Sequence, residues 1–321
     1  MKNKAAVIDM GTNTFHLLMV ALGEGGFETL YKEKVPVKIG QGGIQQNLIL
    51  PDAQKRALHT LHHFQQLIRG EEIEPVFAFA TSAVRNAENG SSFVKLIRQQ
   101  TGIAVQVIDG EREAELIYKG IRMSGCLDSG NALMMDIGGG SVEFIVGNKD
   151  TIHWKGSFEI GGQRMLDRFH YHDPISREET DKLYQYLSQE LHPLLAAIRE
   201  FRPSQLVGAS GTFDTLTDIY LASRQEKKRR EVHRHRLPID AFYEISDRLI
   251  QLPKKERLEI PGMIPMRVDM IVVASCLIRY ILRQIDSQDM LCSTYSLKEG
   301  ALAEILEGVG VNSDLTVGIG E

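Results

Sequence analysis

Two short stretches of the sequence combine residue types that can hold phosphate: "VIDMGTNTFHLLMV" at 7–20 and "MMDIGGGSVEFIVG" at 134–147. Each has an apolar run, an aspartate, glycine with small polar residues, and a second apolar run. Glycine-rich turns present backbone N–H groups that phosphate oxygens can approach closely. A single turn of this kind fits an ordinary hairpin equally well. The matched pair instead predicts one phosphate site built by two halves of the chain.

An aspartate at the end of an apolar strand needs a nearby cation, and Mg²⁺ accepts carboxylates together with water and phosphate oxygens. We therefore predict Mg²⁺ held by Asp9, Asp136 and Glu143, with a turn or capping role as the alternative for the aspartates. A third turn, "GASGT" at 208–212, opens a helix, and helix N-termini favour anions. The predicted phosphate contacts are Gly11, Thr12, Asn13, Thr14, Gly138, Gly139, Gly140, Ser141, Gly208, Ser210 and Gly211.

The elements that must position these residues follow from hydrophobic periodicity. In the first half, the pattern predicts strands at 4–9, 15–22, 27–34, 75–81 and 104–109, with helices at 50–69, 91–102 and 111–123. In the second half it predicts strands within 132–147, 151–162 and 205–210, with helices at 176–201, 213–223, 239–251, 268–285 and 297–306. The order repeats after about 127 residues, from Asp9 to Asp136. We expect two α/β domains of related topology facing each other across a cleft.

The predicted domains are 1–124, joined by the C-terminal helix 297–308, and 125–296, with 309–321 as a tail. The connector is expected near "MSGCLDSG", which begins at Met123. The net charge of −5 argues against general affinity for nucleic acid or membranes. No apolar run approaches the roughly 20 residues that span a bilayer. Three cysteines, widely spaced and odd in number, favour a reduced, cytoplasmic protein without a zinc site.

Although the net charge is negative, the sequence contains one strongly basic run, "KKRREVHRHR" at 227–236. It fits either a solvated surface segment or a contact for a polyanionic substrate, and the second would weaken with salt. Two further readings are structural. His16 is expected to be a packed strand residue, and Arg267 with Asp269 to form a cap or ion pair before the 268–285 helix.

Five motifs together resemble one family: "AAVIDMGTNTFHLLMV", "ATSAVRNA", "DGEREAELIYKG", "DIGGGSVEFIVG" and "GASGT". Their order and spacing are similar to those of the exopolyphosphatase and guanosine pentaphosphate phosphohydrolase (Ppx/GppA) family, within the sugar kinase–actin–heat-shock ATPase superfamily. The resemblance implies two ribonuclease-H-like domains, Mg²⁺ dependence, and removal of terminal phosphates from inorganic polyphosphate or guanosine pentaphosphate. It also implies a short, two-domain member without the additional helical domain that some relatives carry.

The resemblance assigns roles to two further residues. Glu113 occupies the place of the family's catalytic glutamate, as the general base for water, and Arg85 that of a clamp on the terminal phosphate. Glu111 better fits a helix-start acid, and Arg112 stands where the family often has a second acid. For Arg85 the alternative is a surface arginine with a helix-cap partner.

Two other functions remain open from the sequence: an ATP-dependent small-molecule kinase of the same superfamily, and a non-catalytic nucleotide-binding protein. The acceptor-binding insertion of many such kinases is not found, and an intact base at Glu113 argues against a pure binding protein. The sequence does not rank polyphosphate against guanosine pentaphosphate. A homodimer is possible on the resemblance alone.

Overall fold

The computed structural model describes residues 3–23, 26–229, 231–287 and 289–308. It divides into two compact units, Met1–Leu116 with Leu297–Glu321, and Ile117–Ser296. The division falls inside a helix, between Leu116 and Ile117, whereas the sequence placed it between 124 and 125. The predicted tail 309–321, two residues of the 23–26 turn and Arg230 of the basic run lie outside the described residues.

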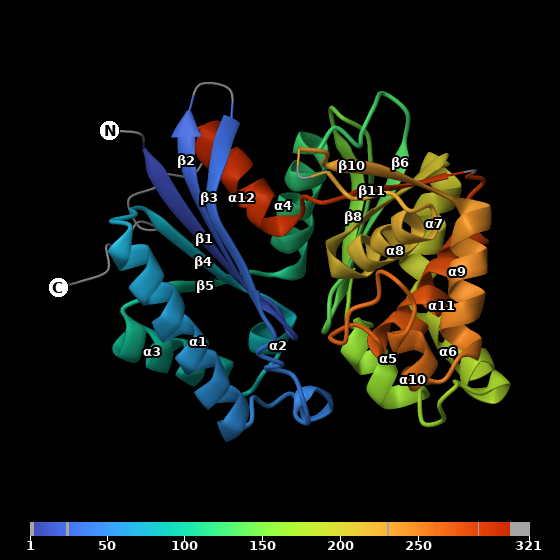
Figure 1. Ribbon diagram of the computed structural model, residues 1–321, viewed down its shortest axis with the longest axis horizontal. Helices are drawn as coiled ribbons and strands as arrows, with labels where there is room; N and C mark the ends of the chain where they lie inside the picture. The colour runs from blue at the N-terminus through green and yellow to red at the C-terminus, as the bar shows by residue number, and fades with distance from the viewer. Residues whose placement is uncertain (1–2, 24–25, 230, 288, 309–321) are drawn as a thin grey trace. The chain divides into compact units, whose positions relative to one another are not determined.

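The first unit is built on a five-stranded sheet in the order β3-β2-β1-β4-β5 (Figure 1). Strands β1 to β3 form an antiparallel meander, and β4 and β5 continue parallel to β1. The strands are β1 (Lys4–Met10), β2 (Phe15–Gly23), β3 (Gly26–Val35), β4 (Val76–Ala80) and β5 (Val105–Val107). The helices are η1 (Ile44–Gln46), α1 (Pro51–Gly70), α2 (Ser82–Arg85), α3 (Gly90–Thr101), α12 (Leu297–Leu306) and the start of α4 (Gly110–Met123).

Local sequence explains the ends of the helices that cover this sheet. Pro51 suits the first turn of α1, where an N–H would have no partner inside the helix. Gly102 ends α3 with a φ of 71°, a left-handed conformation that glycine adopts without a Cβ clash. Apolar side chains on one face of α1 pack on the sheet and on α3, and Phe64 and Phe93 are buried at their centre.

The second unit has a six-stranded sheet in the order β10-β11-β9-β6-β7-β8. Its strands are β6 (Ala132–Ile137), β7 (Val142–Gly147), β8 (Ile152–Phe158), β9 (Gln205–Ala209), β10 (Arg234–Pro238) and β11 (Asp289–Ser293). Its helices are α5 (Gly162–Phe169), α6 (Arg177–Glu190), α7 (His192–Phe201), α8 (Ser210–Ser223), α9 (Ile239–Gln251), α10 (Lys254–Leu258) and α11 (Met270–Leu282). The meander β6-β7-β8 repeats β1-β2-β3, as the internal repeat predicted.

The structure corrects several predicted elements in this unit. The single helix expected over 176–201 is two helices that meet at Leu191, because Pro193 in the first turn of α7 has no N–H to continue the ladder. The sequence did not predict α5, α10, β10 or β11. Strand β10 begins with the last three residues of the basic run, from Arg234, and pairs antiparallel with β11. No helix in the described part of the chain is long and apolar enough to cross a membrane.

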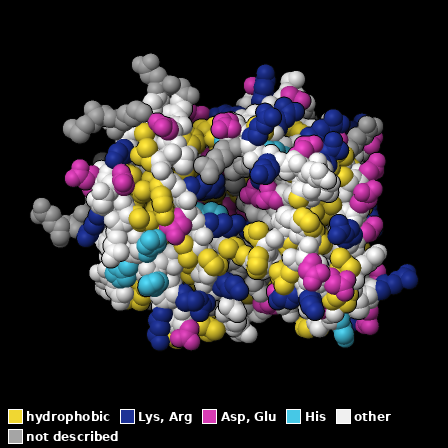
Figure 2. Space-filling model, in the orientation of Figure 1, with side chains coloured by type: hydrophobic (Ala, Val, Ile, Leu, Met, Phe, Trp, Pro, Cys, Tyr) yellow, Lys and Arg dark blue, Asp and Glu magenta, His cyan; other side chains and the backbone are white. Residues whose placement is uncertain are grey.

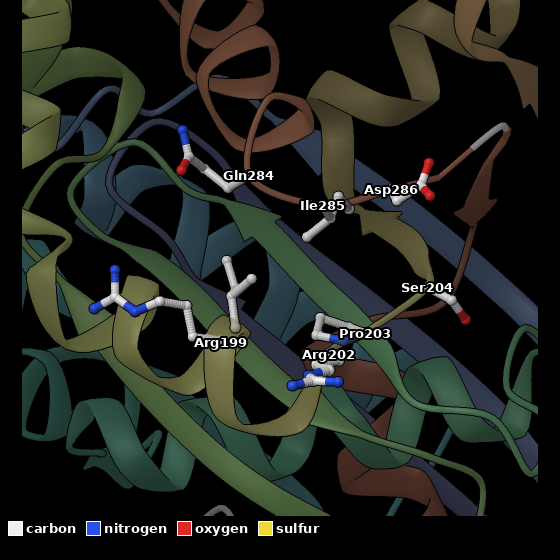
Figure 3. A pocket seen from close by; sticks show the side chains of 8 residues that line it. Arg199, Arg202, Pro203, Ser204, Gln284, Ile285 and Asp286 are labelled. Carbon is white, nitrogen blue, oxygen red and sulfur yellow. The ribbon is translucent and has the colours of Figure 1, made fainter.

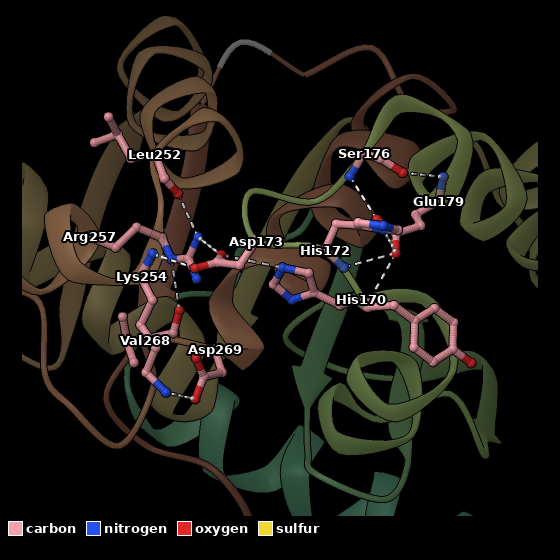
Figure 4. A network of polar contacts seen from close by, with 11 residues as sticks. His170, His172, Asp173, Ser176, Glu179, Leu252, Lys254, Arg257, Val268 and Asp269 are labelled. Carbon is pink, nitrogen blue, oxygen red and sulfur yellow. Dashed lines mark hydrogen bonds and ion pairs between the residues drawn. The ribbon is translucent and has the colours of Figure 1, made fainter.

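A polar network holds the chain around α6 and α10 (Figure 4). The predicted capping box is present: Ser176 Oγ accepts from the Glu179 N–H, and Glu179 accepts from the Ser176 N–H. Arg257 is fully buried, donates to the carbonyls of Leu252 and Val268, and pairs with Asp173 at 2.7 Å. The network therefore stabilises the helical side of the second unit.

Candidate functional site

The first glycine turn joins β1 to β2 and places Asp9 directly opposite His16 in the antiparallel register. The turn closes with a hydrogen bond of 3.1 Å from the Gly11 N–H to the Thr14 carbonyl. The carbonyls of Thr12 and Asn13 are held in turn by the N–H groups of Gly40 and Lys38, at 3.1 and 2.9 Å. Thr12, Asn13 and Thr14 are buried, so the turn is a fixed part of the first unit rather than a loose loop.

The second glycine turn joins β6 to β7 and places Asp136 directly opposite Glu143. Both carboxylates are buried, with 5% and 1% of their surface exposed. Asp136 Oδ2 accepts hydrogen bonds from the hydroxyls of Ser210, at 2.7 Å, and Ser296. Glu143 Oε1 accepts one from Ser157 at 2.7 Å. Two acidic side chains thus face each other across one strand pair, with hydroxyl groups around them.

The carbonyl groups of the glycine triplet are committed to the start of α5. Those of Gly138, Gly139 and Gly140 accept hydrogen bonds of 2.8, 2.9 and 3.1 Å from the N–H groups of 161–163. Within the described residues, no protein acceptor receives a hydrogen bond from the N–H groups of the triplet itself. This geometry leaves the triplet's donors available to an anion, which is what a phosphate-binding turn requires.

The third turn brings Ser210 to the same carboxylate. Strand β9 runs parallel to β6 and aligns Ala209 with Asp136. Ser210 follows with a φ of 69°, a conformation that residues other than glycine adopt at a cost of about 1–3 kcal/mol and that is concentrated at functional sites. Gly208 has a packing role, because a Cβ there would lie 2.0 Å from the Phe213 ring.

Gly211, in the first turn of α8, makes room for Arg267, which was expected to form a cap or ion pair with Asp269. A Cβ on Gly211 would lie 2.0 Å from Arg267 Nη2, so the guanidinium rests against the helix start. Arg267 has 8% of its surface exposed, and its Nε donates no hydrogen bond within the described part of the chain. Burial lowers the pKa of Arg267, opposed by the nearby charges of Asp214 and Asp136. Asp269 stands at the N-cap position of α11, but its side chain makes no capping hydrogen bond and pairs with Lys254 at 2.7 Å, so the ion pair between Arg267 and Asp269 is not formed.

Arg85 and Glu113, assigned from different motifs, lie side by side in the first unit. Arg85 Nη1 donates to Glu113 Oε2 at 2.8 Å and to the Ile108 carbonyl at 3.1 Å. Their side chains are 16% and 9% exposed. Arg85 ends the short helix after β4, and Glu113 lies in the first turn of α4 after β5. The arginine is therefore neither a surface residue nor a helix cap, and its charge stands beside the predicted base.

The donor set of the second hairpin fits a magnesium ion. Cα atoms of opposed residues in an antiparallel pair are about 4.5–5.5 Å apart, so Asp136 and Glu143 can share one cation. Mg²⁺ commonly takes one or two carboxylates and fills its shell with water and phosphate oxygens. No group of three His, Cys, Asp or Glu side chains among the described residues is arranged to hold a metal. The participation of Asp9, which belongs to the other unit, stays a prediction.

Sequence reasoning did not identify the supports of the site. Ser296, which bonds Asp136, comes from just after β11 and carries no motif. Arg164 donates from its Nε to the Gly140 carbonyl at 3.0 Å and pairs with Glu159. The segment 38–40 that holds the first turn gives a signal in "IGQGG", a further glycine-rich stretch. These groups act by tertiary contact, which periodicity does not reveal.

Two surface features lie outside this arrangement. A pocket of about 590 Å³ in the second unit is lined by Ile198, Arg199, Arg202, Pro203, Ser204, Gln284, Ile285 and Asp286, none of them a predicted site residue (Figure 3). In the basic run, Lys228 pairs with Asp214 at 2.8 Å and Arg236 with Asp289 at 2.6 Å. Basic and acidic side chains are interspersed over the face shown in Figure 2. Part of the run's charge is thus neutralised within the unit.

The chain is similar in sequence and fold to proteins of one known family. The model of the Ppx/GppA phosphatase family matches residues 18–308. An exopolyphosphatase from Cytophaga hutchinsonii is 44% identical with a TM-score of 0.93, covering 96% of this chain and 99% of that one. A Ppx/GppA family member from Aquifex aeolicus is 23% identical with a TM-score of 0.80, over 96% and 99% of the two chains. These likenesses confirm the predicted fold class, two α/β domains of the actin and sugar-kinase type. The chain belongs to the Ppx/GppA phosphatase family.

Proposed function

We propose that this protein removes the terminal phosphate of inorganic polyphosphate, the 5′ γ-phosphate of guanosine pentaphosphate, or both, by Mg²⁺-assisted attack of water. The observation that supports this most directly is the pair of the partly buried Arg85 and the buried Glu113, a cation for phosphate beside a base for water. The similar protein from Cytophaga hutchinsonii is itself called an exopolyphosphatase.

Glu113 is the proposed general base. It accepts a proton from water as the water oxygen bonds to the terminal phosphorus and the bridging P–O bond breaks. The bond electrons leave with the shortened phosphate chain, whose low proton affinity makes a general acid unnecessary. General-base catalysis by a placed carboxylate is typically worth about 10²–10⁴ in rate.

The charge that develops on the terminal phosphate needs donors fixed in advance. The N–H groups of the glycine triplet and the hydroxyl of Ser141 are proposed to supply them, with Thr12 and Asn13 from the other turn. A guanidinium has five N–H donors, so Arg85 can bind a phosphate oxygen while it holds Glu113. Arg267 would add a second guanidinium, which lies against Gly211 at the start of α8.

Asp136 and Glu143 are proposed to hold Mg²⁺, with Asp9 contributing as the sequence predicted. The bound ion would neutralise phosphate oxygens, which is the usual contribution of Mg²⁺ to phosphoryl transfer. The basic run is a secondary contact at most, because Lys228 and Arg236 are already paired. A cytoplasmic location, the lack of nucleic-acid partners and a homodimer stay predictions.

The test measures phosphate release from long-chain polyphosphate and from guanosine pentaphosphate in parallel, with and without Mg²⁺. We expect Mg²⁺-dependent release by the wild-type protein and a loss of about 10²–10⁴ in Glu113→Gln, with substrate binding retained. Wild-type rates in Glu113→Gln would refute the mechanism. Transfer of phosphate from ATP to an acceptor, without release from either substrate, would support the kinase alternative.

A further inference from the structure

Helix α12 forms an ion pair with Arg112, the residue that precedes the proposed base Glu113. Arg112, in the first turn of α4, donates from Nη1 to Glu304 Oε1 at 2.7 Å and from Nη2 to Glu304 Oε2. A two-pronged pair between a planar guanidinium and a carboxylate fixes orientation as well as distance. Helices α4 and α12, which lie side by side in Figure 1, are joined by this pair across 192 residues of sequence.

The pair is partly removed from water. The side chain of Glu304 is 11% exposed and that of Arg112 is 36% exposed. Hydrogen bonding to Glu304 raises the pKa of Arg112, against the opposing effect of burial. Pairs sheltered in this way are screened less than surface pairs, and removing one partner leaves the other charge buried.

Helix α12 is itself fixed to the sheet of the first unit. It packs on β1, and its nearly fully buried Glu299 pairs with Lys298 at 3.2 Å and lies 4.0 Å from Lys32 of β3. Glu304, five residues further along the same helix, therefore belongs to an element that is fixed to the sheet. Its contact with Arg112 therefore restricts the movement of the first turn of α4 relative to α12.

The orientation of Glu113 depends on this turn of α4. Neighbouring residues on a helix point about 100° apart, so fixing Arg112 on one side directs Glu113 to another. On that other side it meets Arg85 at 2.8 Å. Glu304 is the closer of two acidic partners of the Arg112 guanidinium, since Glu115 of the same helix lies 3.4 Å from Nη1. The N–H of Arg112 is held as well, by Asp109 Oδ1 at 2.7 Å.

We propose that Glu304 is a positioning residue for catalysis: through Arg112 it fixes the first turn of α4 and so the direction of the Glu113 carboxylate toward Arg85. This inference rests on the proposed function, in which Glu113 is the base. It also assigns a structural role, the pair with Glu304, to Arg112, which stands where the family often has a second acid.

The test compares Glu304→Ala, Glu304→Gln, Arg112→Ala and the double variant Arg112→Ala/Glu304→Ala. The control is Glu178→Gln, which breaks an exposed ion pair of 2.7 Å with Lys182 in α6. We expect kcat for phosphate release to fall about tenfold in each alanine variant, with KM within about twofold, because a displaced base slows the chemical step. The double variant should be no slower than either single one, since both remove the same contact. Glu304→Gln, which keeps the shape and one acceptor, should recover part of the rate.

Hydrogen exchange measured by mass spectrometry supplies a readout that does not need activity. The amides of 110–116 should exchange faster in Glu304→Ala than in wild type, and at the wild-type rate in the control. Unchanged exchange and kcat, a rise in KM alone, or losses that multiply in the double variant would each overturn the proposal. If the wild-type protein releases no phosphate from either substrate, the proposed function fails, while the exchange rates still decide whether Glu304 fixes α4.

Discussion

The two glycine hairpins share a backbone plan and differ in the residue that faces the aspartate. In the first unit Asp9 is opposed by His16, and in the second Asp136 is opposed by Glu143. The row extends on the neighbouring strand to Lys34 in the first case and Ser157 in the second. The first row therefore mixes basic and acidic groups, whereas the second concentrates two carboxylates. In the proposed mechanism, the second hairpin is therefore the main holder of the cation, and Asp9 of the first hairpin is a weaker contributor.

The two turns also differ in what supports them. The first is held by the N–H groups of an irregular segment, at Lys38 and Gly40. The second is held by the first N–H groups of α5, with Arg164 bonded to the Gly140 carbonyl. A helix start is more rigid than an irregular segment. Disturbing the support should therefore affect the second turn more than the first.

The largest effect that separates the hairpins is expected from removing one carboxylate. Asp136→Asn should lower phosphate release by about 10²–10³, with a loss of response to Mg²⁺, because the proposed cation would lose a buried ligand. Asp9→Asn should cost about tenfold. Phosphate release titrated against Mg²⁺ concentration measures both. A larger loss in Asp9→Asn than in Asp136→Asn would reverse the assignment of the cation to the second hairpin.

A smaller difference in activity between the two hairpins is expected when a glycine that supports each turn is changed to alanine. In Gly161→Ala the new Cβ would lie 2.4 Å from the carbonyl carbons of Gly139 and Gly140, so the triplet must move. We expect phosphate release to fall about tenfold or more. Gly40→Ala is the matched control, because its Cβ would meet Thr12 Cγ2 at 2.6 Å, the end of a side chain that can rotate. Equal losses of phosphate release in the two variants would show that the different supports of the two turns do not affect activity.

The residue opposite the aspartate gives the next test. His16 Nε2 lies 3.0 Å from Thr14 Oγ1, and glutamine can keep a contact of that kind. We expect His16→Gln to change kcat less than about threefold, since His16 is expected to be a packed strand residue and has no part in proton transfer in the proposed mechanism. A loss near that expected for Asp136→Asn would give the first hairpin a catalytic group that its sequence did not suggest.

These comparisons also show what the sequence can and cannot reveal. Features written in a few neighbouring residues were predicted correctly: the end of α3 at Gly102, the capping box at Ser176, and the bounds of α9 and α12. Pro193 is also a local signal, because a proline there marks the start of a new helix, but one continuous helix was predicted from the sequence over 176–201. Strand β11 was missed because "DMLCS" is too short to show a period, and it becomes a strand only between β9 and β10.

The same distinction applies to the site. Both aspartates, the glycine turns and Glu113 are marked by motifs, so they could be named before the structure. Arg267 and Ser296 are not, since each becomes part of the site through a contact made far away in sequence, with Gly211 and Asp136. Their placement depends on burial and on tertiary contacts, which are properties of the packed protein.

The smallest effect on activity is expected away from both hairpins, at the capping glutamate of α6. Burial would raise the pKa of Glu179, but hydrogen bonds from the Ser176 N–H, His172 and the Tyr171 N–H outweigh it and lower the pKa to about 2, from 4.5. A carboxylate with a lowered pKa stabilises the folded state above its unfolded pKa, and this stability is lost as the pH falls. Glu179→Gln should therefore lower the free energy of unfolding by about 1–3 kcal/mol at pH 7.

The difference from wild type should shrink as the pH falls from about 4.5 toward 2, because both proteins then carry a neutral group at this position. Urea unfolding at several pH values measures it, and phosphate release at neutral pH should stay within about twofold of wild type. Glu178→Gln is the control, since the pKa of the neighbouring Glu178 is also lowered, by Lys182, in a pair that solvent screens. A constant difference across this range would mean that Glu179 stabilises the cap by shape and not by charge. A large loss of activity would instead link the α6 cap to the second hairpin, and the site would then extend beyond the turns that the sequence marks.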